Sequence, residues 1–131
     1  MALAYDVVVR NAMLDTISAR IDLGSAGLLR IYDGTRPATG GTATTLLAAL
    51  TLSDPCAPAA AAGALTFSAI TSSSVLTAGT ATWFRLVTSA GTFVVDGSVG
   101  TSGSDLNLNT LALVSNAQIS VSSFVITEGN P

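Results

Sequence analysis

The side chains that could take part in chemistry are few in this chain of 131 residues. It has seven aspartates, one glutamate, five arginines and one cysteine, with no histidine and no lysine. Histidine is the usual proton shuttle near neutral pH and lysine the usual amine nucleophile, so most routes to catalysis are missing. Composition alone excludes Ser-His-Asp, Cys-His and Ser-Lys arrangements. We therefore expect a protein that is not an enzyme and has no catalytic residues.

Carboxylates remain as possible acids and bases, and two of them stand in similar short segments. Residues 33–35 are Asp-Gly-Thr and residues 96–98 are Asp-Gly-Ser. Catalysis by paired carboxylates needs both acids in one pocket with separated pKa values. Asp-Gly followed by Thr or Ser is instead typical of a tight turn. We interpret both segments as turns.

One segment superficially matches the start of a calcium-binding loop. Asp105–Asn109 alternates carboxylate or amide side chains with leucines, but the loop's required Gly and Glu are replaced by Thr110 and Asn116. The alternation fits a strand with its leucines inward. The glycine spacing in residues 97–103 matches neither phosphate-binding motif. We expect no metal and no cofactor.

Cys56 is the only cysteine, so an internal disulfide is impossible. It lies between Pro55 and Pro58, which places it in a loop. We interpret it as a passive thiol; the alternative is a crosslink between two chains.

The charge balance also limits the partners of this chain. Its net charge is -3, and 17 threonines and 15 serines supply most of its polarity. The scattered arginines form no basic stripe for nucleic acid, and no stretch approaches the ~18 apolar residues of a membrane helix. The small number of charged side chains favours self-association or docking on other proteins, because repulsion between like charges normally keeps monomers apart.

One helix is predicted, over residues 6–23. Its apolar residues recur every four positions and form one stripe: Val9, Met13, Ile17 and Ile21. Asp6 is placed to cap its start and Gly24 to end it. The opposite face is polar and is expected to meet solvent: Asn11, Asp15, Ser18 and Asp22.

Beyond the helix, short β-type runs separated by Gly, Pro and Ser-Asp turns predict an antiparallel β-sandwich or jelly-roll-like domain over residues 28–127. The whole chain, 1–131, is then one mainly β domain. Seven strands are expected: 28–32, 44–52, 65–70, 81–87, 92–99, 106–113 and 119–127. The strongest local signal is a hairpin whose loop, 89–91, ends in Gly. Residues 33–43 and 53–63 are predicted to be irregular loops able to reach a neighbour.

Trp83 and Phe84 are adjacent in a predicted strand, so their rings must point to opposite faces. Trp83 shares its face with Arg85 and Val87. We interpret Trp83 as core or interface packing, with a carbohydrate or peptide platform as the alternative.

Three stretches of the chain resemble a group of small proteins encoded by tailed bacteriophages and prophages: Arg10–Pro55, Gly79–Gly100 and Asp105–Thr110. The resemblance implies a virion component made in the bacterial host cytoplasm. Specifically, it implies a decoration or cement protein on the capsid surface that binds the major capsid protein and itself, often as a homotrimer. A tail or fibre module that binds a host glycan or receptor is the alternative.

A cement protein needs broad, weakly charged contact surfaces. Arginine is favoured over lysine at interfaces, so Arg30, Arg36 and Arg85 are candidate anchors. The alternative for each is solvation at the surface or an internal pair with Asp33 or Asp96. The candidate interface residues are Arg30, Arg36, Pro37, Cys56, Trp83 and Arg85.

Overall fold

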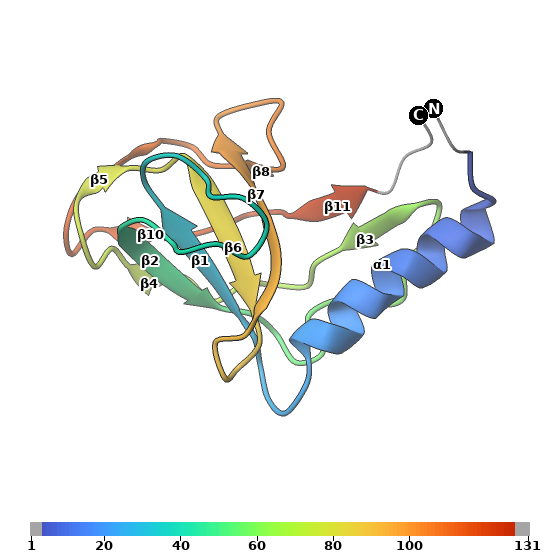
Figure 1. Cartoon of the computed structure of the whole chain (residues 1–131). Coiled ribbons are helices and arrows are strands. Elements are labelled where there is room, and N and C mark those ends of the chain that lie inside the picture. The colour runs from blue at the N-terminus through green and yellow to red at the C-terminus, as the bar shows by residue number, and fades with distance from the viewer. Residues whose placement is uncertain (1–3, 128–131) are drawn as a thin grey trace.

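The computed structural model describes residues 4–127 and shows one helix and eleven strands in that part of the chain (Figure 1). The helix α1 spans Val7–Ile21. The strands are β1 (Leu28–Tyr32), β2 (Leu46–Thr51), β3 (Ala64–Thr66), β4 (Ser73–Ser74), β5 (Gly79–Thr80), β6 (Trp83–Val87), β7 (Phe93–Gly100), β8 (Leu106–Asn107), β9 (Ala112–Leu113), β10 (Gln118–Ile119) and β11 (Val125–Thr127). The predicted class, mainly β with one N-terminal helix, is confirmed.

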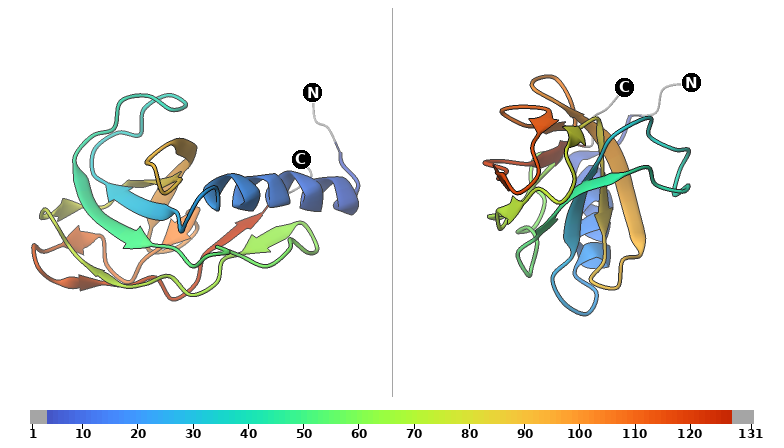
Figure 2. Two further views of the ribbon diagram at one scale, coloured as in Figure 1. Left: turned by 90° about the horizontal axis from the view of Figure 1, so that it is seen from below. Right: turned by 90° about the vertical axis from the view of Figure 1, so that its left-hand side faces the viewer.

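Five strands form a curled sheet in the order β2-β1-β6-β7-β8 (Figure 2). Three two-stranded ladders complete the fold: β10-β4, β11-β3 and β5-β9. All pairs are antiparallel except β7 with β8, which is parallel and short. That parallel pair departs from the purely antiparallel prediction, because the loop after β7 brings the chain back to run alongside it.

The predicted hairpin joins β6 to β7. Gly91 has φ +86°, the left-handed conformation that the turn requires. The Thr88 amide donates to the Thr92 carbonyl at 3.0 Å and closes the loop. The hairpin prediction is confirmed.

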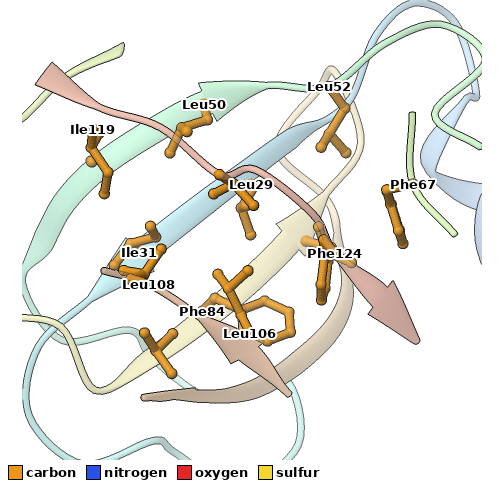
Figure 3. Packing of buried hydrophobic residues seen from close by; sticks show 14 of the residues in the cluster. Leu29, Ile31, Leu50, Leu52, Phe67, Phe84, Leu106, Leu108, Ile119 and Phe124 are labelled. Carbon is orange, nitrogen blue, oxygen red and sulfur yellow. The ribbon is translucent and has the colours of Figure 1, made fainter. Parts of the chain in front are cut away.

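The core lies on the inner face of the sheet (Figure 3). Phe84 of β6 meets the edge of Phe124 with ring centroids 5.2 Å apart, and Phe124 stacks on Phe67. The helix contributes Leu14 and Ile21, which are fully buried. The predicted apolar stripe is only partly right, because Val9 at the start of the helix is 44% exposed.

Two strands predicted as long are each divided in two. In the 106–113 region, the Leu108 amide donates to the carbonyl of Gly100 at the end of β7, but the Leu111 carbonyl accepts the Ala81 amide just after β5. The chain therefore changes partners midway. Likewise β10 pairs with β4 and β11 pairs with β3, although one run, 119–127, was predicted. β4 and β5 were not predicted.

The polar face of α1 does not simply meet solvent. Its carboxylate and amide oxygens accept backbone amides of the 53–63 loop: Asp22 from Cys56 at 3.0 Å, Asp15 from Ala60 at 2.7 Å and Asn11 from Gly63 at 2.9 Å. The solvent-face prediction is wrong for these three residues. An irregular loop has amides without a ladder partner, and the helix supplies their acceptors.

Replacing Asp22 with alanine should lower the free energy of unfolding by about 1–3 kcal/mol, because it leaves the Cys56 amide without its acceptor. Urea unfolding measures the loss. Asp6→Ala is the matched control: Asp6 is the N-cap residue of α1 but makes no side-chain cap bond. Equal losses in the two variants would contradict the role given to Asp22.

Candidate functional site

The outer face of the sheet carries the most unusual group of side chains in the described chain. On β6, Phe84 and Leu86 point into the core, so Trp83 and Arg85 point to the other side. The cross-strand neighbours of Trp83 and Arg85 on β1 are Tyr32 and Arg30. Trp83 is only 1% exposed, because the 33–45 segment arches over this face (Figures 1 and 2).

Aromatic rings and a guanidinium form a stack on the outer face. Tyr32 and Trp83 stack with centroids 4.4 Å apart. The Arg85 guanidinium carbon lies 5.2 Å from the ring centroid of Trp83 and 5.2 Å from that of Phe93. Both contacts are within the range of cation–π attraction. Both adjacent rings at positions 83 and 84 are thus buried, one on each face.

Arg85 also makes a buried ion pair. Its Nε donates to Asp96 Oδ1 at 2.7 Å and one terminal nitrogen donates to Oδ2 at 3.0 Å, a two-point contact. The same terminal nitrogen donates to the Gly41 carbonyl at 2.8 Å. Hydrogen bonding to Asp96 raises the pKa of Arg85 above its ordinary value. Arg85 therefore ties the covering loop to β6 and β7.

Hydrogen bonds from Trp83, the first residue of β6, and from Thr82, just before it, hold the two ends of the covering loop. The Trp83 Nε1 donates to the Asp33 carbonyl and to Thr44 Oγ1, each at 3.0 Å. The Thr82 hydroxyl donates to the Gly34 carbonyl at 2.6 Å. Gly34 has φ +74°, and the chain bends there as it leaves β1, so the predicted turn at residues 33–35 is present only as a bend.

The second Asp-Gly segment does not form a turn, and that prediction is wrong. Asp96 and Gly97 lie inside β7, opposite Arg85 and Phe84. A Cβ on Gly97 would lie 2.4 Å from Cε1 of the Phe84 ring. Glycine is present here because the ring occupies the space that a side chain would need.

The structure brings five of the six predicted interface residues to one side of the sheet. Arg36 is exposed and Pro37 half-buried on the covering loop. Arg30 is half-buried on the outer face of β1. Trp83 and Arg85 lie beneath the loop. Arg85 pairs with Asp96 inside the protein, which was the alternative to its role as an interface anchor. Arg30 and Arg36 make no salt bridge among residues 4–127.

Cys56 lies apart from the outer face, beneath α1, and is 1% exposed. Burial, followed by the charge of Asp22 and a hydrogen bond to it, raises the pKa of the thiol to about 12. A buried, protonated thiol is a poor nucleophile. The passive-thiol interpretation fits this environment, and a crosslink between folded chains does not.

The Cys56 thiol should stabilise the fold less as the solution becomes alkaline. Its folded pKa of about 12 exceeds the ordinary 9.0, so its contribution is complete below pH 9 and is lost as the pH rises toward 12. The stability of the native protein should fall relative to Cys56→Ala by about 1.4 kcal/mol per pH unit in that window. Urea unfolding at pH 8 and pH 10.5 measures this. A constant difference between the two proteins would refute it.

Six of the eight exposed large apolar side chains in residues 4–127 lie toward two ends of the molecule; the other two are Leu23, just after α1, and Val125 of β11. At the start of α1, Val8 is 67% exposed, and its neighbours Tyr5, Val7 and Val9 are 37–44% exposed. Between β4 and β5, Leu76 is 59% exposed, and between β9 and β10, Val114 is 65% exposed. The views in Figures 1 and 2 place β4, β5 and β10 at the end remote from the first turn of α1.

Within residues 4–127, no three His, Cys, Asp or Glu side chains cluster as a metal site would require. The described helix is too short to cross a membrane. No protein-family model, curated protein or solved structure matches the chain.

Proposed function

We propose that this chain is a non-enzymatic structural protein of a tailed-phage virion, a decoration or cement protein that binds the major capsid protein and associates with itself as a homotrimer. The observation that carries the proposal is the pair of exposed apolar ends. Large exposed apolar groups on a small domain mark contact sites. Two such groups, far apart, suit a protein that touches more than one neighbour.

The outer face supports the same proposal. Arg36 offers a guanidinium group on the covering loop, which is fixed by Arg85 and Trp83, and Arg30 offers another on the sheet face that the loop covers. A contact surface held by internal bonds loses little conformational entropy on binding. The missing histidine and lysine also favour a structural role.

Sedimentation of the purified chain, alone and with empty capsids of its phage, tests the proposal. We expect a trimer in solution and co-sedimentation with capsids. Val8→Asp should weaken at least one of these associations, because it places a charge on the most exposed apolar residue. A chain that sediments as a monomer and does not co-sediment with capsids would refute the cement role. Binding to a glycan array would then favour the tail or fibre alternative.

A further inference from the structure

The outer edge of β7 is an unfilled strand-pairing site. β8 pairs with β7 only at Val99 and Gly100, so residues 93–97 have a neighbour, β6, on one side alone. In an antiparallel ladder, every second residue directs its amide and carbonyl to the same neighbour. The Val99 amide donates to Thr82, so the register turns the backbone of Asp96 and Ser98 away from β6.

The outward backbone groups of Ser98 and Asp96 differ in their hydrogen bonding. The Ser98 amide donates to the Asp105 carboxylate at 2.9 Å, which closes the edge at that point. The described residues give the outward amide and carbonyl of Asp96 no hydrogen-bond partner. An edge with unpaired backbone groups is a template for another strand.

Grooves flank this edge on both faces and share Val95 and Asp96. The outer groove lies between β7 and the covering loop, and Arg36, Pro37 and Phe93 line it. The inner groove lies between β7 and β11, where Phe84, Ile126 and the 41%-exposed Val125 form an apolar strip beside the polar Ser104 and Asp105. An added strand sends alternate side chains to opposite faces and so would fill both grooves.

Charge indicates what the outer groove accepts. Asp96, the one carboxylate that lines this groove, is already paired with Arg85. Arg36 and Arg30 are left as cations without a salt bridge in the described chain. Among the residues that line the outer groove, Arg36 therefore carries the one uncompensated charge, which is positive although the whole chain has a net charge of -3. An acidic side chain is the complementary group.

We propose that the open edge of β7 binds an extended segment of the capsid subunit by strand addition. An acidic side chain of that segment faces Arg36, and its apolar side chains enter the inner groove. The segment's backbone bonds to the outward amide and carbonyl of Asp96. This inference rests on the proposed function, because it takes the capsid protein as the partner.

Two surface variants test the site with purified empty capsids. Arg36→Glu reverses the charge at the outer groove, and Ala38→Trp fills it; both residues are exposed. Arg20→Glu and Ala19→Trp, exposed on α1, are the matched controls. We expect Arg36→Glu and Ala38→Trp to weaken capsid binding about tenfold relative to these controls. Equal binding by test and control variants would overturn the inference.

Amide hydrogen exchange reports on the edge directly. In the wild-type chain, exchange in residues 93–97 should slow when capsids are bound and not on trimer formation alone. Slowing on trimer formation would assign the edge to a second copy and overturn the inference. Capsid binding that leaves amide exchange in residues 93–97 unchanged would also overturn the inference. If the wild-type chain binds no capsids, the proposed function itself fails.

Discussion

Gly27→Ala should lower the free energy of unfolding by about 3 kcal/mol, the upper part of the range for overpacked cores. Gly27 is buried where the end of α1 meets β1 and β6. A Cβ there would lie 2.5 Å from Cγ2 of Ile21 and 2.7 Å from the Val87 carbonyl oxygen. A shift of the helix could relieve the contact with Ile21, but the contact with the oxygen of the paired strand β6 can be relieved only if the backbone at Gly27 also moves. Chemical denaturation measures the loss.

Gly103→Ala is the matched control, since it makes the same substitution in open space. A Cβ at Gly103 would have nothing within 4 Å, but its φ of +68° makes alanine strained. That strain costs about 1 kcal/mol. If Gly27→Ala costs no more than Gly103→Ala, the close packing at Gly27 does not hold the helix to the sheet.

Asp96→Val should cost about 3–5 kcal/mol, because it leaves the Arg85 guanidinium buried without a counter-charge. The side chains of Arg85 and Asp96 are 11% and 6% exposed, so water replaces little of the lost contact. The double variant Arg85→Met, Asp96→Val removes both charges and should recover most of that stability. Urea unfolding of the two single variants and the double variant gives the coupling energy.

Limited proteolysis separates the two roles of Arg85. Arg85→Met also removes the bond to the Gly41 carbonyl, so the 33–45 loop should be cut faster in both variants that carry it. Asp96→Val keeps Arg85 and should be cut more slowly than either. Additive losses of stability, with no coupling between positions 85 and 96, would contradict the account of the outer face.

Local patterns predicted the parts of the fold that depend on neighbours in sequence. β1 was predicted with its observed bounds, and the β6–β7 hairpin has its left-handed glycine at position 91. Positive φ and two-residue alternation are local properties, so the sequence carries them directly. The short strands β4 and β5 were missed because only distant partners, β10 and β9, make them strands.

Five of the six candidate interface residues lie on one side of the sheet, but the sequence did not predict how they are arranged there, and whether they form an interface stays a prediction. Alternation placed Trp83 and Arg85 on one face, but it did not reveal that a loop covers that face. Sequence alone does not decide between surface solvation and a carboxylate partner for Arg85, because only the register of β6 and β7 sets Asp96 beside it. The solvent-face prediction for the polar stripe of α1 fails for a similar reason. In the sequence, an Asp or Asn side chain that accepts the amide of a distant loop cannot be distinguished from one that faces solvent.

The number of copies that one empty capsid binds at saturation tests the central claim most directly. Quantitative mass spectrometry of capsids separated from free protein gives this number. A trimeric cement protein at local symmetry axes should saturate at a fixed ratio to the capsid subunit, with a copy number divisible by three. Binding that never saturates, or none at all, would contradict the claim that this chain is a capsid decoration protein.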